Sequence, residues 1–309
     1  MVQDVGQKKD CIFEKIERMG EMAFTGNIKR AVITGATGGI GREVCKYLAS
    51  NGYAIYAACR NISKGEELRA SLPDGKRELL HLIELDLTSF DSTEKFCKEI
   101  IQRLKGKKID LLINNAGMIA RNYTITPDGY EISMQVNYIS VKKITETLLP
   151  YIEGKIINTV SCTIHSANIK RAVSKLNKAV VTNAGSAISK KQNTIKSLLS
   201  YSDSKLMLAL YTIGLHKKRG SKIEVYGADP GIVNTGIISM HRWYDSLADI
   251  IFRPFIKAPA RGALPIINAI EYISDSKNQT DVPLLFMSGK TKFFPKRIFR
   301  EYGRGSNHL

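Results

Sequence analysis

Residues 30–41 read Arg-Ala-Val-Ile-Thr-Gly-Ala-Thr-Gly-Gly-Ile-Gly. The first five residues are a short run rich in Val and Ile, which is typical of a buried strand. The glycines after Thr34 allow a tight turn, and an amphipathic helical pattern follows from Gly41. Such a turn lets the backbone approach a pyrophosphate, whose charge the helix N-terminus favours. The stretch therefore predicts the first strand and helix of a phosphate-binding α/β unit.

The same alternation continues along the chain. Apolar runs typical of strands occur at 30–34, 54–58, 80–85, 111–114, 155–160, 224–228 and 284–287, and helical patterns at 41–50, 92–105, 129–149 and 202–219. Unbroken alternation of this kind indicates βαβ units around a buried parallel sheet. We therefore expect an α/β fold, a single doubly wound Rossmann-type domain over 28–288 with a mainly parallel sheet of seven strands.

Composition excludes several classes of protein. The chain has 309 residues, of which 43% are hydrophobic and 24% charged, so it is neither disordered, collagen-like nor a disulfide-stapled miniprotein. Five scattered cysteines form no metal-ligand spacing, which predicts no metal site and a reducing, cytoplasmic setting. No apolar run reaches the ~18 residues that a membrane span needs.

Most of the net charge of +17 lies in two segments that interrupt or follow the alternation of strands and helices. An insertion at 162–199 has seven basic and no acidic residues, and a C-terminal tail at 289–309 has six basic residues and one acidic. We expect both to lie on the surface, together with a helical N-terminal extension over 1–27. A further segment, 236–258, concentrates apolar and aromatic residues and predicts a loop over a hydrophobic substrate.

The end of the second strand indicates which dinucleotide binds. Arg60 and Asn61 follow this strand, and the segment 53–65 has no Asp or Glu. A free ribose usually meets a carboxylate at this position, whereas a 2′-phosphate is matched by a guanidinium that donates two hydrogen bonds. We therefore expect NADP(H) rather than NAD(H).

Three Tyr-x-x-x-Lys pairs compete for the chemical step. A lysine four residues after a tyrosine shares its helix face and can lower the pKa of the phenol toward the working pH. Tyr138/Lys142 has no strand-end polar partner at a useful distance, and Tyr151/Lys155 straddles a helix-to-strand junction at Gly154. Tyr201/Lys205 opens a helix after the strand that ends at Ser161, so we prefer this pair.

The sequence resembles the short-chain dehydrogenase/reductase family over roughly residues 28–290. Five motifs occur in order: TGATGGIG at 34–41, Asp86-Leu87, Asn-Asn-Ala-Gly at 114–117, Ser161 with Tyr201/Lys205, and Pro-Gly-Ile-Val-Asn-Thr at 230–235. Residues 255–263 are similar to a stretch in its retinol dehydrogenase-like branch. The positions expected to contact the cofactor are Gly35, Thr37, Gly38, Gly39, Ile40, Gly41, Arg60, Asn61, Asp86, Leu87, Asn114, Ala116, Gly117, Tyr201, Lys205, Pro230, Gly231, Val233 and Thr235.

The resemblance implies a role for each catalytic position. Tyr201 is the general acid or base toward the substrate oxygen, and Lys205 holds the nicotinamide ribose and depresses the Tyr201 pKa. Ser161 hydrogen-bonds the substrate carbonyl. Asn137 matches the family's fourth catalytic residue and supports a water and Lys205 in proton relay.

These observations predict an NADP(H)-dependent oxidoreductase that interconverts a small hydrophobic alcohol and its aldehyde or ketone. Two alternatives stay open: a cofactor-binding regulator with little turnover, and a basic protein that binds nucleic acid or a membrane surface. The regulator is disfavoured because all four catalytic positions are occupied, and nucleic acid because aromatic side chains do not interleave the basic segments. We expect a cytoplasmic protein, with peripheral contact to an anionic membrane and a homodimer or homotetramer left open.

Overall fold

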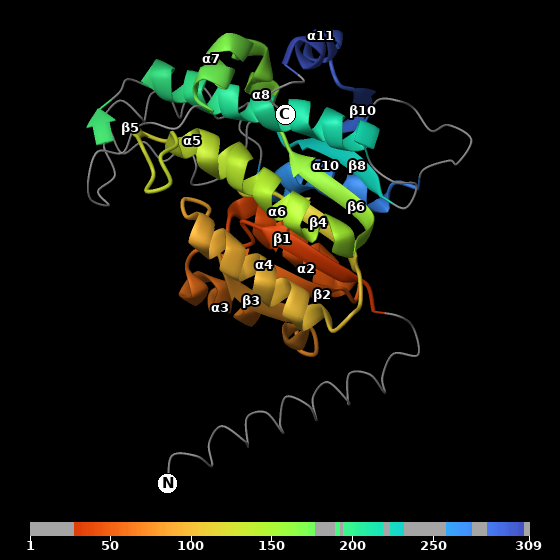
Figure 1. Cartoon of the computed structure of the whole chain (residues 1–309). Helices are drawn as coiled ribbons and strands as arrows, with labels where there is room; N and C mark the ends of the chain where they lie inside the picture. The colour runs from red at the N-terminus through yellow and green to blue at the C-terminus, as the bar shows by residue number, and fades with distance from the viewer. Residues whose placement is uncertain are drawn as a thin grey trace.

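The helices and strands follow the order that the sequence pattern predicts (Figure 1). The computed structural model describes residues 28–176, 189–191, 194–218, 223–231, 258–273 and 283–305. Its strands are β1 (Arg30–Thr34), β2 (Ala54–Cys59), β3 (Leu80–Glu84), β4 (Ile109–Asn114), β5 (Asn122–Thr124), β6 (Ile152–Thr159), β7 (Ser189–Lys191), β8 (Glu224–Asp229), β9 (Leu284–Met287) and β10 (Lys290–Phe293). Its α-helices are α2 (Gly39–Ser50), α3 (Ile62–Ala70), α4 (Phe90–Leu104), α5 (Ile132–Met134), α6 (Ser140–Leu148), α7 (Ile169–Ser174), α8 (Thr194–Lys218), α10 (Pro259–Glu271) and α11 (Lys296–Gly305).

The main sheet confirms the doubly wound α/β fold. Its strand order is β10-β9-β8-β6-β4-β1-β2-β3, and every neighbouring pair is parallel except β10 with β9. The first strand in the sequence, β1, lies in the interior of the sheet. Later strands are added on both sides of it, so the connections cover both faces. Among the residues described, this sheet has eight strands rather than the expected seven, because 290–293 pair antiparallel with β9.

Alternate residues along the strands feed two separate cores. Val32 on β1 packs into a core with α4, α6 and α8, whereas Ala31 and Ile33 pack into a core with α2 and α10. This division follows from the two-residue repeat of a strand, whose successive side chains point to opposite faces. Figure 1 shows α4, α6 and α8 side by side along one face. None of the described helices combines the length and apolarity needed to span a bilayer.

Two expected helices differ from the pattern. The helix expected over 129–149 is divided into α5, a π-helical turn at Gln135–Ile139 and α6. The helix expected from 202 begins at Thr194, eight residues earlier, so Tyr201 lies inside α8 rather than at its start. A π-helical turn inserts one extra residue per turn, and such turns occur frequently at functional sites.

The basic C-terminal segment is part of the folded structure. The sequence predicts a basic tail over 289–309, but β10 extends the sheet and α11 packs against α7 and α8. Phe294 and Ile298 of this segment are buried in the core beneath α8. The N-terminal extension 1–27, nearly all of the substrate loop 236–258 and the middle of the insertion lie outside the described residues.

Candidate active site

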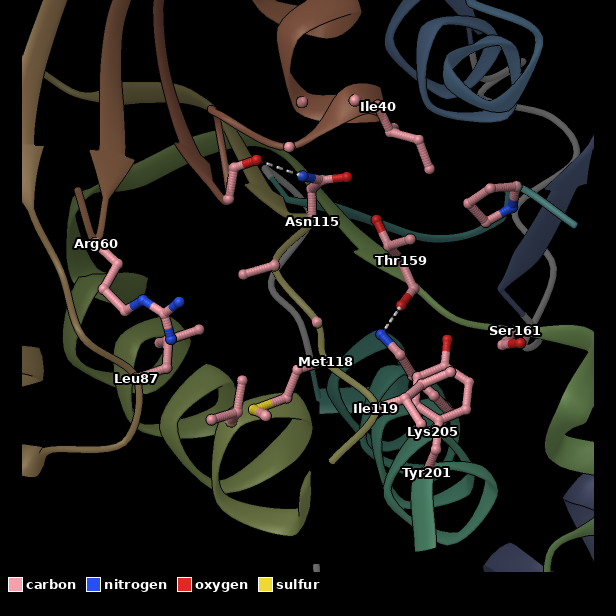
Figure 2. Close-up of a pocket in the computed structure, with 18 of the residues that line it drawn as sticks. Ile40, Arg60, Leu87, Asn115, Met118, Ile119, Thr159, Ser161, Tyr201 and Lys205 are labelled. Carbon is pink, nitrogen blue, oxygen red and sulfur yellow. Dashed lines mark hydrogen bonds between the residues drawn. The ribbon is translucent and has the colours of Figure 1, made fainter. Parts of the chain in front are cut away.

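A cavity of about 880 Å³ runs along the carboxyl ends of the central strands. Residues from the ends of β1, β2, β4, β6 and β8 line it, together with the first turn of α2 and the first half of α8. Figure 2 shows Arg60 toward one end and Ser161, Tyr201 and Lys205 gathered toward the other. Ligands of open α/β sheets bind at this edge, where the strand order reverses.

The glycine turn between β1 and α2 forms one wall. Gly35 adopts a positive φ of 67°, a conformation that favours glycine. A Cβ atom on Gly41 would lie 2.2 Å from the Gly35 carbonyl oxygen, so the helix approaches the turn as closely as only glycine permits. Gly38 caps α2 without a side-chain hydrogen bond, and the first turn of the helix has no acidic residue. The backbone N–H groups of this turn are therefore suited to an anionic ligand.

The two asparagines of the Asn-Asn-Ala-Gly segment face different surroundings, one the cavity and the other the core. Asn115 lines the cavity and donates through Nδ2 to the carbonyl oxygens of Thr34 (3.0 Å) and Gly35 (3.2 Å), which holds the glycine turn against β4. Asn114 does not line the cavity. It is 1% exposed and donates to Asn158 Oδ1 (2.8 Å) and Thr145 Oγ1 (3.0 Å), because its strand position directs it inward.

Two cations line the end of the cavity beyond β2. Arg60 follows this strand and is exposed, and Lys64 lies one turn into α3. Asn61 caps α3 by accepting from the Lys64 backbone N–H (3.1 Å), so its side chain shapes the helix start and does not line the cavity. Asp86 also lines the cavity, and its Oδ1 atom accepts from the backbone N–H (2.9 Å) and Oγ1 (2.8 Å) of Thr88. The cavity lining thus includes two exposed positive side chains and a carboxylate held by Thr88.

The opposite end brings together the three residues that the sequence singled out. Tyr201 and Lys205 project from successive turns of α8, with the Lys205 Nζ atom 5.9 Å from the centre of the Tyr201 ring. Lys205 Nζ donates to the Thr159 carbonyl oxygen (2.7 Å) at the end of β6. Ser161 follows two residues later, where its Oγ atom accepts from the Thr163 backbone N–H (3.3 Å).

Burial shifts the proton affinities of this pair in opposite directions. It lowers the pKa of Lys205 to about 8, an effect that the Asp229 carboxylate opposes. It raises the pKa of Tyr201 to about 12, although the hydrogen bond with Ser161 works in the opposite direction. Burial therefore outweighs the influences that lower the Tyr201 pKa, and the Lys205 ammonium donates to Thr159. That Lys205 lowers the pKa of this phenol stays a prediction. The phenol is protonated near neutral pH.

Asn137 lies behind the cavity wall in the π-helical turn and has no exposed surface. Its Oδ1 atom accepts from the Met118 backbone N–H (2.8 Å), and its Nδ2 atom donates to the Met118 carbonyl (2.9 Å) and to Ser204 Oγ (2.9 Å). A Cβ atom on Gly117 would lie 3.4 Å from Asn137 Oδ1 and 3.2 Å from Lys205 Nζ. The side chains of Asn137 and Lys205 therefore both lie next to Gly117, where they leave little room for a Cβ atom.

The two other Tyr-x-x-x-Lys pairs lie away from the cavity. Tyr138 is buried against Tyr211. Lys155 donates to the Ile270 carbonyl oxygen (2.6 Å) at the C-terminal end of α10. Neither pair lines the cavity, which leaves Tyr201/Lys205 as the pair beside a strand-end serine.

Most of the expected cofactor contacts line this one cavity. They are Gly35, Thr37, Gly38, Gly39, Ile40, Gly41, Arg60, Asp86, Leu87, Ala116, Gly117, Tyr201, Lys205, Pro230 and Gly231. Val233 and Thr235 lie outside the described residues. The lining residues that sequence reasoning missed include Lys64, Asn115 and Leu198. Lys64 follows Arg60 by four residues at the start of a helix, so the charge argument made for Arg60 could also have found it.

Comparison with known proteins agrees with this geometry. Residues 29–175 match the short chain dehydrogenase family. Retinol dehydrogenase 11 of Mus musculus is 30% identical over 290 residues, which cover 88% of this chain and 84% of that protein. Retinol dehydrogenase 12 of Bos taurus is 31% identical over 241 residues, 76% of this chain and 71% of that protein.

The chain belongs to the short-chain dehydrogenase family. The expected likeness to its retinol dehydrogenase-like branch is confirmed.

Solved structures show the same fold at lower identity. A protein from Mycobacterium paratuberculosis matches with a TM-score of 0.64 and 24% identity, covering 90% of this chain and 89% of that one. The NADPH-bound carbonyl reductase from chicken fatty liver matches with a TM-score of 0.58 and 19% identity, covering 84% and 97%. As a member of the family, the chain is a dehydrogenase/reductase that interconverts alcohols and carbonyl compounds.

Proposed function

We propose that this short-chain dehydrogenase uses NADP(H) to interconvert a hydrophobic alcohol and its aldehyde or ketone. The observation that carries the proposal is one continuous cavity with a glycine turn and Arg60 toward one end and Ser161, Tyr201 and Lys205 toward the other. A bound dinucleotide supplies or accepts the hydride. The protein's part is to hold the reactants and to move a proton.

The side chains of this chain suit that division of work. Tyr201, protonated at neutral pH, donates its proton to the substrate oxygen in reduction and takes it back in oxidation. Ser161 donates a hydrogen bond to the same oxygen and stabilises its developing negative charge. Lys205 holds the ribose of the nicotinamide half, and Asn137 fixes the backbone at Met118 beside it.

The substrate class is inferred from the surroundings of Tyr201. Met118, Ile119 and Leu198 add apolar surface near the catalytic end of the cavity. Figure 2 shows Ile119 beside Tyr201 and Lys205. An apolar wall with few polar groups favours a hydrophobic carbonyl compound. The names of the retinol dehydrogenases place retinoids among the compounds to test first.

The test is a screen of NADPH oxidation against all-trans-retinaldehyde, medium-chain aldehydes, ketosteroids, quinones and sugar-like carbonyls. Tyr201→Phe is the blank: we expect turnover to fall by about 100- to 10,000-fold because the proton donor is removed. The dissociation constant for NADPH should change little, since the ring remains. Normal turnover in this variant would remove Tyr201 from the mechanism, and activity confined to sugar-like carbonyls would overturn the hydrophobic substrate.

The cofactor preference has its own test at Arg60. We expect Arg60→Ala to raise the KM for NADPH about 10- to 100-fold, because a charge-assisted hydrogen bond to the 2′-phosphate is lost, and to leave the KM for NADH unchanged. Arg103→Ala on α4 is the control, because it removes an arginine of similar exposure that lies outside the cavity. An equal effect on both cofactors would contradict the assignment.

A further inference from the structure

A buried carboxylate on the rear of the catalytic helix binds two cations of the basic insertion. Asp203 on α8 has no exposed side-chain surface. Its oxygens accept from Arg171 Nε (2.5 Å), Arg171 Nη2 (2.8 Å), Lys175 Nζ (2.9 Å) and the Asn168 backbone N–H (3.1 Å). Lys175 Nζ also donates to Ser200 Oγ (3.0 Å), one turn earlier on α8. The insertion therefore begins with a helix, α7, fixed to α8 through one carboxylate.

Helix geometry explains why this cluster does not enter the cavity. At about 100° per residue, Asp203 projects some 200° around the axis from Tyr201, and Lys205 returns to the Tyr201 side. Tyr201 and Lys205 line the cavity, whereas Asp203 meets α7. One turn of α8 thus carries two cavity residues on one side and the anchor of the insertion on the other.

The anchored segment is continuous with Ser161. Only the 3₁₀ turn at Cys162–Ser166 and two residues separate Ser161 from α7. Arg297 of α11 holds the same segment by donating to the carbonyl oxygens of His165 (2.9 Å) and Ala167 (3.2 Å). The chain after Ser161 is therefore held at His165, Ala167 and Asn168, which leaves few free dihedral angles between these contacts and the serine.

We propose that Asp203 is a positioning residue. Its bonds to Arg171 and Lys175 hold α7 against α8, and this fixes the position of Ser161 relative to Tyr201 across the cavity. The proposal rests on the proposed function of those two residues. An apolar contact could hold α7 against α8 equally well, but four donors converging on two carboxylate oxygens also fix its rotation and slide along α8. Displacement of a reacting group by 1 Å is enough to reduce catalysis about 100-fold.

The experiment uses the full chain, four single variants and one double variant. Asp203→Asn removes the carboxylate charge, Asp203→Glu is the conservative change, and Arg171→Gln removes one cation while leaving Lys175 to pair with Asp203. Arg171→Gln guards against a folding failure in Asp203→Asn, because the Arg171 side chain is 37% exposed. Arg103→Gln, which breaks an ion pair with Glu99 of 2.6 Å on α4, is the matched control.

Three measurements separate positioning from simple support. We expect hydrogen exchange of the amides in 162–176 to accelerate about tenfold or more in Asp203→Asn. Labelling of the exposed Cys162 thiol, next to Ser161 in the chain, should also accelerate. A Cys11→Ser background makes the label report on Cys162, since Cys45, Cys59 and Cys97 are buried. With the panel carbonyl that is reduced fastest, kcat should fall about 10- to 100-fold, with the KM for NADPH within about twofold.

Further outcomes decide the proposal. Arg171→Gln should show a smaller loss in all three measurements, Asp203→Glu should recover part of kcat, and the Asp203→Asn/Arg171→Gln double variant should lose no more than Asp203→Asn alone. Faster exchange with unchanged kcat and thiol labelling would show a purely structural role and overturn the proposal, as would unchanged exchange. If the wild-type chain reduces no carbonyl, the proposed function has failed, and the exchange and labelling results still decide whether Asp203 fixes this segment.

Discussion

Lys205 shows how a single buried residue connects stability to pH. Its side chain is almost fully enclosed, and burial lowers its pKa from 10.5 to about 8. The folded protein therefore binds fewer protons at this site than the unfolded chain between about pH 8 and 10.5. Burial of the charged form opposes folding fully below pH 8, and this opposition disappears as the pH rises through that window.

We expect the free energy of unfolding of the wild-type chain to rise relative to that of Lys205→Met between pH 8 and 10. Methionine keeps most of the apolar volume and has no proton to lose, so the difference between the two proteins isolates Lys205. Urea unfolding at pH 7.5, 9 and 10 measures it. A difference that stays constant over this range would contradict the lowered pKa.

At the scale of an element, close packing in the β1–α2 unit determines which residues its turn can accept. Strand, turn and helix are assembled around the contact between Gly41 and the Gly35 carbonyl, which leaves no room for a Cβ atom. Gly38 is in a different situation, since the nearest neighbour of an added Cβ atom would be the Gly35 oxygen at 3.4 Å, an ordinary contact. Two glycines of one motif therefore differ in what they tolerate.

Gly41→Ala should lower the free energy of unfolding by about 1–3 kcal/mol, because α2 must move away from the turn. The same movement displaces the N–H groups of the helix start, so NADPH affinity should fall with it. Gly38→Ala is the matched control for stability and should lose less than about 1 kcal/mol. Equal losses of stability in thermal or urea unfolding would show that the close approach of α2 is not what requires glycine.

On the scale of the whole molecule, the two basic segments contribute helices to the folded structure. The insertion and the C-terminal segment, separated by about 90 residues or more, come together on α8 as α7 and α11, and Arg297 joins them through backbone carbonyls. Figure 1 shows the two helices adjacent at one end of the molecule. Three of the cations in these two segments, Arg171, Lys175 and Arg297, therefore hold the chain that follows Ser161.

The adjacent residues Phe293 and Phe294 test this integration. Phe294 is 2% exposed and packs in the core, whereas Phe293 is 52% exposed on the edge strand. We expect Phe294→Ala to lower the free energy of unfolding by about 3–5 kcal/mol, since it leaves a cavity beneath β8. Phe293→Ala should change it by less than about 0.5 kcal/mol. Similar small effects for both would indicate that the C-terminal segment does not contribute to the core.

The local pattern of the sequence was sufficient for the order of strands and helices, the glycine turn and the preference for Tyr201/Lys205. These features depend on repeats of two or 3.6 residues and on spacings of a few positions, which a sequence displays directly. Thr34 and Ser161 could be assigned to the same sheet edge because parallel strands place their carboxyl ends together.

Only the tertiary structure decided which partners the individual side chains meet. The inward turn of Asn114, the direction of Lys205 toward Thr159 and the raised pKa of Tyr201 all depend on packing between segments far apart in the chain. The burial of Asp203 between two cations and the pairing of β10 with β9 are of the same kind. A sequence pattern specifies the face on which a residue lies, whereas dielectric surroundings and hydrogen-bond partners arise only when those faces come together.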